Sequence, residues 1–224
     1  MIQNDLSIIM TKEFGEFLKE RAKNSPHKHI WDQVFKAAAD KGFKAEFTLE
    51  IEMALKVNLL SISDELFELL EKNMDDMHLK EALLNMLILD GKNMNKIAEI
   101  ILNEFKLNSS RKDFTVRENL YLWALGDDLY RLSLKKYHKD YLDIVNQKNF
   151  GDARQMVIRM LRLKKFRTPE TLSVFLNNLD DDSINGHVLD ALSKFDFPEK
   201  REIAERFLLD ERKWVAKIAK KMLS

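Results

Sequence analysis

The sequence predicts an all-α protein, and three observations support this fold class. Only six glycines and three prolines occur among 224 residues, which leaves little of the turn punctuation that a sheet of many hairpins requires. Leu, Lys, Glu, Ala and Met, which favour helices, are abundant. Apolar residues recur at i, i+3, i+4 and i+7, and no segment sustains the strict alternation typical of a strand. We therefore expect helices joined by short turns.

Capping signals and this periodicity define the individual helices. Ser25 and Thr168 each precede a proline, so that a capping hydroxyl stands before the first helical position, and Pro198 opens another helix. Ser61-Ile62-Ser63-Asp64 is a weaker variant of the capping box, with Asp in place of Glu or Gln. The expected helices cover residues 11–23, 27–41, 45–57, 62–73, 76–89, 93–105, 114–131, 137–147, 151–165, 169–179, 182–195, 199–208 and 212–223.

The C-terminal helices follow a repeat of 31 residues. Five columns keep apolar character through three copies, each with a first helix, a short polar turn and a second helix. A looser fourth copy, DFTVRENLYLWALGDDLYRL, precedes them. The columns are Tyr141/Leu172/Ile203, Val145/Leu176/Phe207, Ala153/Ile184/Val215, Val157/Val188/Ala219 and Leu161/Leu192/Leu223.

Short motifs within the repeat carry a family resemblance. Val116-Arg117 is followed by Ala124-Leu125, Ala153 by Arg154, and Leu179-Asp180 by Ala191-Leu192. This pattern resembles HEAT repeats, and the segments WALGDDL, NFGDARQM and LDDDSINGHVLDAL resemble a group of bacterial HEAT-repeat proteins of largely unassigned function. Two departures are Asn185 and Ala216, which stand where the pattern has arginine, and the spacing of 31 is short for HEAT repeats.

The resemblance implies an architecture and a role for the arginines. The implied fold is a right-handed α-solenoid (superhelix) of roughly six stacked antiparallel helix pairs, with a concave groove lined by second helices. Residues 113–224 form the clear HEAT-like repeats, and residues 1–112 continue them by helicity, so we expect one helical-repeat domain over 1–224. In such repeats, arginine at 117 and 154 would bridge to an aspartate of the neighbouring repeat.

The stretch DDDSINGHVLDAL, residues 180–192, raises the question of a calcium loop. Counted from Asp181, the oxygen ligands at positions 1, 3 and 5 of an EF-hand loop and its glycine at position 6 are in place, but positions 9 and 12 are Leu189 and Leu192, whose side chains supply no oxygen. Leu192 is also a core column of the repeat. We therefore interpret Asp181 or Asp182 as a cap of the second helix, and Gly186 as a point where a neighbouring helix packs closely.

Several classes of site find no support in the sequence. Cysteine is absent, which excludes disulfides and thiolate ligands and is typical of a reducing cytosol. No nucleotide-binding glycine loop and no GxSxG motif occurs. The five histidines lack the spacing of a metal site, and a surface role is the preferred interpretation. We expect no metal and no cofactor.

Charge and hydropathy limit the kinds of partner that we expect for this chain. The 37 basic and 37 acidic residues cancel, yet residues 45–90 hold eleven acidic residues and three lysines, a local net charge of −8. The bases concentrate over residues 154–167, which include Arg159, Arg162, Lys164, Lys165 and Arg167. We prefer to interpret both charged segments as solvated helix faces. The alternative is that the basic segment forms a patch that binds an acidic partner. With no apolar run of about 18 residues and no signal peptide, we expect a cytoplasmic protein without a membrane span.

Two hypotheses for function remain. The first is a non-enzymatic interaction scaffold that holds another protein or peptide in its concave groove, with the basic cluster Arg159, Arg162, Lys164, Lys165 and Arg167 as candidate binding residues. The alternative is a nucleic-acid-binding protein, including an alkyl-base DNA glycosylase. Trp123 and Asp127 share a helix face, as in helical-repeat glycosylases that pair a tryptophan with an aspartate. The zero net charge disfavours nucleic acid.

Overall fold

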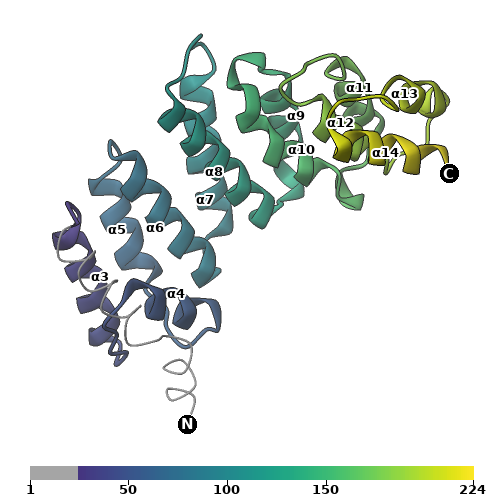
Figure 1. Ribbon diagram of the computed structural model, residues 1–224. Helices are drawn as coiled ribbons and strands as arrows, with labels where there is room; N and C mark the ends of the chain where they lie inside the picture. The colour runs from purple at the N-terminus through teal and green to yellow at the C-terminus, as the bar shows by residue number, and fades with distance from the viewer. Residues whose placement is uncertain (1–24) are drawn as a thin grey trace. The chain divides into compact units, whose positions relative to one another are not determined.

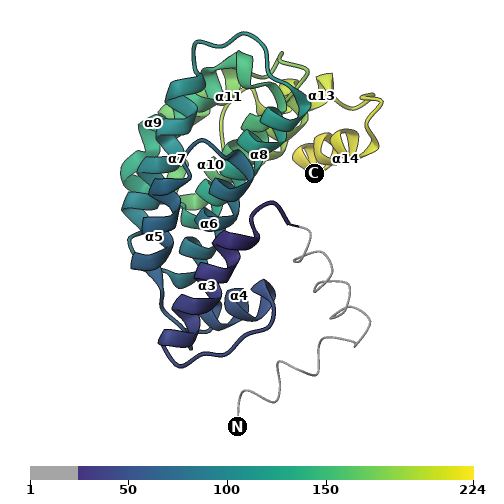
Figure 2. The same ribbon diagram turned by 90° about the vertical axis from the view of Figure 1, so that its left-hand side faces the viewer.

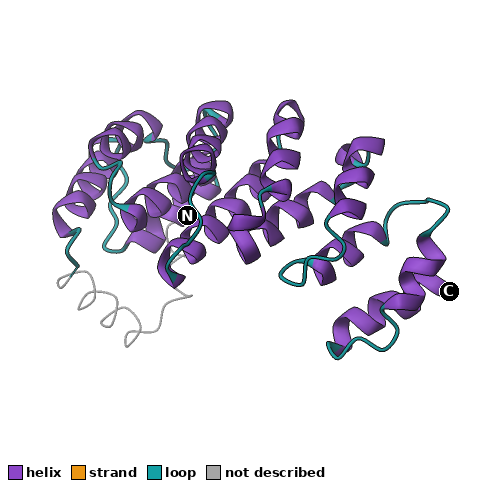
Figure 3. Cartoon of the chain, turned by 90° about the horizontal axis from the view of Figure 1, so that it is seen from above, coloured by secondary structure: helices purple, strands orange, loops and turns teal. Residues whose placement is uncertain are grey.

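The computed structural model describes residues 25–224, and all regular structure in this range is helical (Figures 1 and 3). Within these residues there are twelve α-helices, labelled α3 to α14, three short 3₁₀ helices, labelled η1 to η3, and no strand. The all-α prediction is thus confirmed for this range. The helix expected at 11–23 lies outside the described residues. No helix within residues 25–224 is long and apolar enough to cross a lipid bilayer.

The chain divides into two compact units, with the boundary between Ile97 and Ala98. This boundary lies inside α7 (Met94–Asn108). The described helices of the first unit are α3 (Lys28–Asp40), α4 (Thr48–Lys56), α5 (Ser63–Lys72) and α6 (Met77–Asp90). Here α5 and α4 pack on α6, and α3 contacts α4 and α5. The core of this unit is aliphatic and includes Ile51, Leu55, Leu66, Leu70, Leu83 and Leu87.

Polar groups fix the helix ends of the first unit. Asp76 caps α6 by accepting hydrogen bonds from the backbone N–H groups of His78 and Leu79. The capping role expected for residues 61–64 is wrong, because no side chain caps α5. The hydroxyls of Ser61 and Ser63 instead donate to the buried carboxylate of Asp90, at the C-terminal end of α6. These serines therefore tie the start of α5 to the end of α6 rather than cap α5.

The second unit contains the predicted helical pairs. Its second helices contact one another in sequence, α10 with α12, α12 with α14 and α8 with α10. In Figure 2, α8 lies beside α10 and α9 beside α11, which it contacts. The first helices α9, α11 and α13 begin at His138, Pro169 and Lys200, at intervals of 31 residues, which is compatible with a helical repeat. The elements are α8 (Val116–Leu132), η1 (Lys135–Tyr137), α9 (His138–Asn146), η2 (Lys148–Arg154), α10 (Gln155–Leu161), η3 (Lys164–Phe166), α11 (Pro169–Asn177), α12 (Asn185–Leu192), α13 (Lys200–Arg206) and α14 (Lys213–Leu223).

Burial follows the repeat columns most closely in the second helices. The columns that begin with Ala153 and Val157 are fully buried in all three copies. Leu161 and Leu192 are buried as well, whereas Leu223, near the chain end, is 37% exposed. In the first helices, Leu172 and Leu176 are only half-buried. The core of this unit is therefore centred on the second helices, which also provide the surface described below.

Two second helices begin later than the sequence predicts. Gly151 adopts a left-handed φ of 49°, which an L side chain rarely adopts, so residues 148–154 form η2 and α10 starts only at Gln155. The aspartate turn has a similar effect on α12, because the backbone N–H groups of Ile184 and Asn185 donate to the carbonyl of Asp181. α12 consequently starts at Asn185 instead of residue 182.

Candidate functional site

One face of α8 leaves three apolar side chains exposed. Val116, Leu120 and Trp123 are 80%, 63% and 38% exposed, and their spacing places them on one helix face. Another face of α8 is buried against η2 and α10, where Gly126 allows close approach, because a Cβ there would lie 3.3 Å from the carbonyl oxygen of Ala153. We call Val116, Leu120 and Trp123 the α8 stripe.

The α8 stripe borders a cavity of about 450 Å³, which we call the α8 cavity. Besides the stripe, its lining includes Asn119 of α8 and Asp152, Ala153 and Gln155 of η2 and α10. The Oδ1 atom of Asn119 is buried and accepts no hydrogen bond from a described residue. The amide nitrogen of Gln155 is oriented by the backbone carbonyl of Ser183, at 3.5 Å. The cavity therefore combines an apolar rim with polar groups that accept hydrogen bonds.

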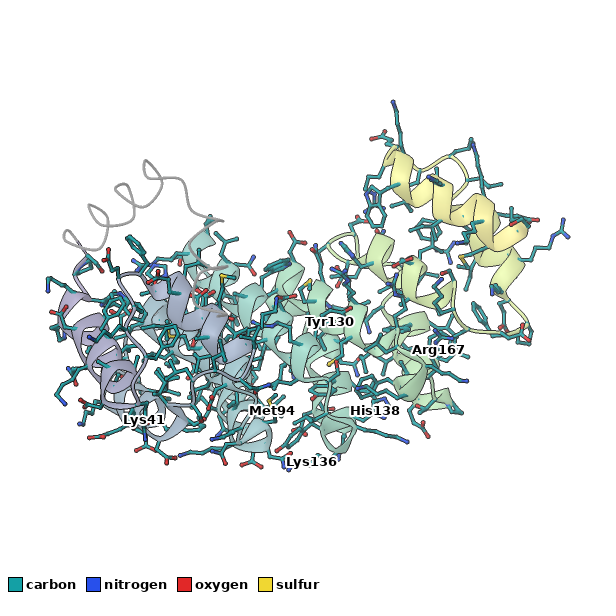
Figure 4. The ribbon with its side chains drawn as sticks, turned by 90° about the horizontal axis from the view of Figure 1, so that it is seen from below. Lys41, Met94, Tyr130, Lys136, His138 and Arg167 are labelled. Atoms are coloured by element: carbon teal, nitrogen blue, oxygen red, sulfur yellow. The ribbon has the colours of Figure 1, made fainter. Side chains whose placement is uncertain are left out.

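Asp127 and Tyr130 continue the exposed face of α8. Asp127 lies one helical turn after Trp123 and is half-buried, and it forms no ion pair with a described residue. The guanidinium of Arg159 lies 5.2 Å from the ring centroid of Tyr130, which Figure 4 labels on α8. The structure thus places Trp123 and Asp127 on one helix face, as the sequence predicts, and it brings Arg159 of the basic cluster to the same helix.

The rest of the basic cluster is divided among different contacts. Arg162 forms an ion pair with Asp190 of α12. Arg167, labelled in Figure 4, donates from Nε to the backbone carbonyl of Arg162 at 2.9 Å. Lys164 and Lys165 are exposed on η3, where the Nζ of Lys165 lies 5.3 Å from the centroid of Phe166. Partner binding by this cluster stays a prediction, since two of its arginines already serve contacts within the protein.

Arg154 is the charged side chain that the fold buries completely. Its exposure is 0%, and its guanidinium donates to the carbonyls of Gly151 and Val145, both at 3.0 Å. It also donates to Asp181 Oδ2 at 2.7 Å and to Ser183 Oγ at 2.9 Å. The bridge to an aspartate of the next helical pair that the HEAT resemblance implies is confirmed for Arg154. Arg117, by contrast, is exposed.

The three aspartates of the turn, residues 180–182, form contacts with other side chains of the protein. Asp180 pairs with Arg206 at 2.5 Å, Asp181 with Arg154, and Asp182 accepts from the amide of Asn185 at 3.2 Å. No side chain caps α12, so the expected cap by Asp181 or Asp182 is wrong. No group of three or more His, Asp or Glu side chains within residues 25–224 is arranged to hold a metal ion.

Asp181 is an acid whose pKa the fold alters. Burial of the carboxyl raises the pKa, but hydrogen bonds from Ser183 and Arg154, together with the positive charge of Arg154, outweigh burial. The pKa of Asp181 is therefore lowered from its ordinary value, and the carboxylate stays ionised opposite the buried guanidinium. This charge pair connects the turn before α12 to η2.

Gly186 and His187 meet the last helix of the chain. A Cβ on Gly186 would lie 2.5 Å and 2.7 Å from two ring carbons of Trp214, so the close helix packing expected at this glycine is confirmed. The ring of His187 lies 5.2 Å from that of Trp214 and is half-buried. Burial lowers the pKa of His187, although the charges of Asp190 and Asp152 oppose the shift. The surface role preferred for the histidines does not hold for this one.

A second cavity, of about 290 Å³, lies between α7 and α9. Its floor includes Phe105 and Phe150, whose rings meet edge to face at 5.3 Å. At its rim Lys106 pairs with Asp140 at 3.0 Å. The sequence gives no signal of this cavity, because its lining residues come from segments about forty residues apart and no local motif marks their approach.

Comparison with known proteins yields no match: no family model, no curated protein and no solved structure resembles the chain closely enough to be counted. The arguments about function below therefore rest on the residues and their geometry.

Proposed function

We propose that the chain is a HEAT-like α-solenoid of roughly six helix pairs that acts as a non-enzymatic interaction scaffold and binds a segment of another protein. The 31-residue intervals between α9, α11 and α13 support the repeat, as do the successive contacts of α8, α10, α12 and α14. The single observation that carries the binding function is the α8 stripe, exposed beside the α8 cavity.

An exposed apolar stripe of this kind favours association with a partner. Full burial of one large apolar side chain is worth about 1.5–3 kcal/mol, so covering Val116, Leu120 and Trp123 supplies enough free energy for a specific contact. Tryptophan is also among the residues that most often dominate binding energy at interfaces. The spacing i, i+4, i+7 matches the anchor spacing with which helices dock into grooves. A peptide segment that covers this face is therefore the favoured partner.

A peptide selection tests the proposal. Random 12-residue peptides are displayed and selected on the full chain, and each selected peptide is then titrated by fluorescence polarisation. We expect the double variant Val116→Ser/Leu120→Ser to weaken binding at least about tenfold, because the apolar rim is lost. The matched control is Leu107→Ser, which removes an apolar side chain that is 75% exposed on α7. Peptides that bind the double variant as tightly as the parent chain would contradict this use of the α8 stripe.

Nucleic-acid binding stays the second candidate, because Trp123 is exposed and has Asp127 on the same helix face. Stacking of a base on an indole ring would use this arrangement. Two observations weigh against it: Arg154 and Arg162 are engaged in ion pairs within the protein, and the α8 cavity is lined by the carboxylate of Asp152. A titration with labelled DNA at 50 mM and 200 mM salt tests the alternative, since phosphate contacts make binding strongly salt-dependent.

A further inference from the structure

We infer that the α8 cavity takes an arginine side chain of a partner segment in which apolar residues flank that arginine. This inference rests on the proposed function and specifies the chemistry of the peptide that the α8 stripe binds. It is carried by the free polar atoms of the cavity, by the exposed ring of Trp123 and by the apolar rim.

The free polar atoms around the α8 cavity are hydrogen-bond acceptors. Asn119 presents a buried Oδ1 without a partner among the described residues. Asp152 is exposed, lines the cavity and forms no ion pair with a described residue. The amide nitrogen of Gln155 already faces the carbonyl of Ser183, which leaves its oxygen free. A ligand that satisfies this set must donate several hydrogen bonds and carry positive charge.

The exposed indole of Trp123 selects a planar cation over a compact one. A guanidinium stacks on an aromatic face and gains a cation–π attraction, for which tryptophan is the strongest partner. The same helix already carries one such contact, where the guanidinium of Arg159 lies over Tyr130. An arginine can stack on Trp123 while its N–H groups reach the carboxylate of Asp152. A lysine offers three donors and no planar face.

The size and rim of the α8 cavity fit an arginine with apolar neighbours. Its volume of about 450 Å³ falls in the range of about 300–1,000 Å³ that is usual for ligand pockets. Val116 and Leu120 form the rim beside Trp123, where flanking leucines of the partner would pack. The nearby bases do not compete for the site, because Arg159 lies over Tyr130 and Arg162 pairs with Asp190.

The test compares arginine with citrulline, its neutral isostere. The tripeptides Ac-Leu-Arg-Leu-NH₂ and Ac-Leu-citrulline-Leu-NH₂ are titrated into the full ¹⁵N-labelled chain, and the indole N–H resonances of Trp31, Trp123 and Trp214 are followed after assignment by Trp→Phe substitution. We expect the arginine peptide to shift the Trp123 resonance saturably, with a dissociation constant at least about tenfold lower than that of the citrulline peptide. The resonances of Trp31 and Trp214 should not move.

A neutral variant tests whether the carboxylate of the cavity is responsible. Asp152→Asn should reduce the preference for arginine over citrulline several-fold and should retain the circular dichroism of the parent chain. Asp143→Asn is the matched control, because Asp143 is an exposed carboxylate on α9 that does not line the α8 cavity. Equal effects of the control and of Asp152→Asn would overturn the assignment.

The possible results separate this inference from the proposed function. If the selected 12-residue peptides require the α8 stripe but arginine and citrulline peptides bind equally, the inference falls and the proposed function stands. If Val116→Ser/Leu120→Ser leaves the selected peptides unaffected and the arginine peptide does not shift Trp123, both fall. A shift of the Trp123 resonance by a 12-nucleotide oligothymidylate, without a shift by the arginine peptide, overturns the inference in favour of nucleic acid.

Discussion

The positively charged side chain of Arg154 is fully buried. The carboxylate of Asp181 balances its charge, and two backbone carbonyls accept hydrogen bonds from its guanidinium. Arg154→Met should lower the free energy of unfolding by about 3–5 kcal/mol, because it leaves the carboxylate of Asp181 without its cation and the carbonyls of Gly151 and Val145 without the guanidinium donor. Urea denaturation followed by circular dichroism measures the loss. Arg167→Met is the control, with an expected change below about 0.5 kcal/mol, because Arg167 is exposed. A loss below about 1 kcal/mol for Arg154→Met would contradict the structural role.

Single residues also show what the sequence could and could not predict. The close packing at Gly186 could be predicted, because a glycine inside a helical pattern needs a reason, and here Trp214 supplies it. The exposure of Trp123 could not, because an aromatic residue in an apolar helix is usually buried. Its side chain is 38% exposed, whereas Gly126 of the same helix packs closely against Ala153. The unpaired Oδ1 of Asn119 likewise depends on contacts between elements that no local pattern encodes.

At the scale of the element, the start of α8 is fixed by a reciprocal cap. The N–H and the hydroxyl of Thr115 both donate to the carboxylate of Glu118 at 2.8 Å, and the N–H of Glu118 donates back to the hydroxyl at 3.2 Å. The Thr-x-x-Glu spacing of residues 115–118 is the sequence signal of this capping box. The helix expected at 114–131 begins two residues too early, because Thr115 is the cap and Val116 is the first helical residue. The capping hydroxyl expected at Thr168 is confirmed, since Thr168 caps α11.

The cap of α8 gives a testable pH dependence. Hydrogen bonds from the backbone and hydroxyl of Thr115, followed by the contact with Arg111, lower the pKa of Glu118 to about 2. Because the pKa is lowered in the folded state, the stabilisation is present above the ordinary pKa near 4.5 and is lost as the pH falls towards 2. We expect carboxyl ¹³C NMR to give a midpoint near 2 for the parent chain and a clearly higher one for Thr115→Ala. An unchanged midpoint in Thr115→Ala would contradict the cap.

Among the elements, the second helices were predicted best in their core positions and least well at their starts. Val157 and Val188 occupy the same buried column because the 31-residue spacing repeats a complete helical pair. The late starts of α10 and α12 depend on the backbone of Gly151 and on the turn of Asp181, which are decided by local dihedral angles and hydrogen bonds. Apolar periodicity reports which face is buried and says little about where a helix begins.

At the scale of the whole chain, the sequence predicts one domain over 1–224, whereas the described residues divide into two compact units, with the boundary within α7. A continuous helix across the boundary can couple the two units, as neighbouring repeats are coupled in a solenoid, or it can act as a connection between regions that unfold separately. Burial at the boundary does not distinguish these two cases, because Ile97 and Ala98, on its two sides, are both fully buried.

Hydrogen exchange on two matched core variants decides the question. Leu66→Ala in the first unit and Leu161→Ala in the second each truncate a leucine with 0% exposure, at a cost of about 2–5 kcal/mol. If the units open separately, Leu161→Ala should speed amide exchange about thirtyfold or more in the core of residues 98–224 and leave α5 and α6 unchanged, with the converse for Leu66→Ala. Equal acceleration of both units by either variant would contradict separate opening. It would show that α7 transmits the loss along its length, as the single helical-repeat domain requires.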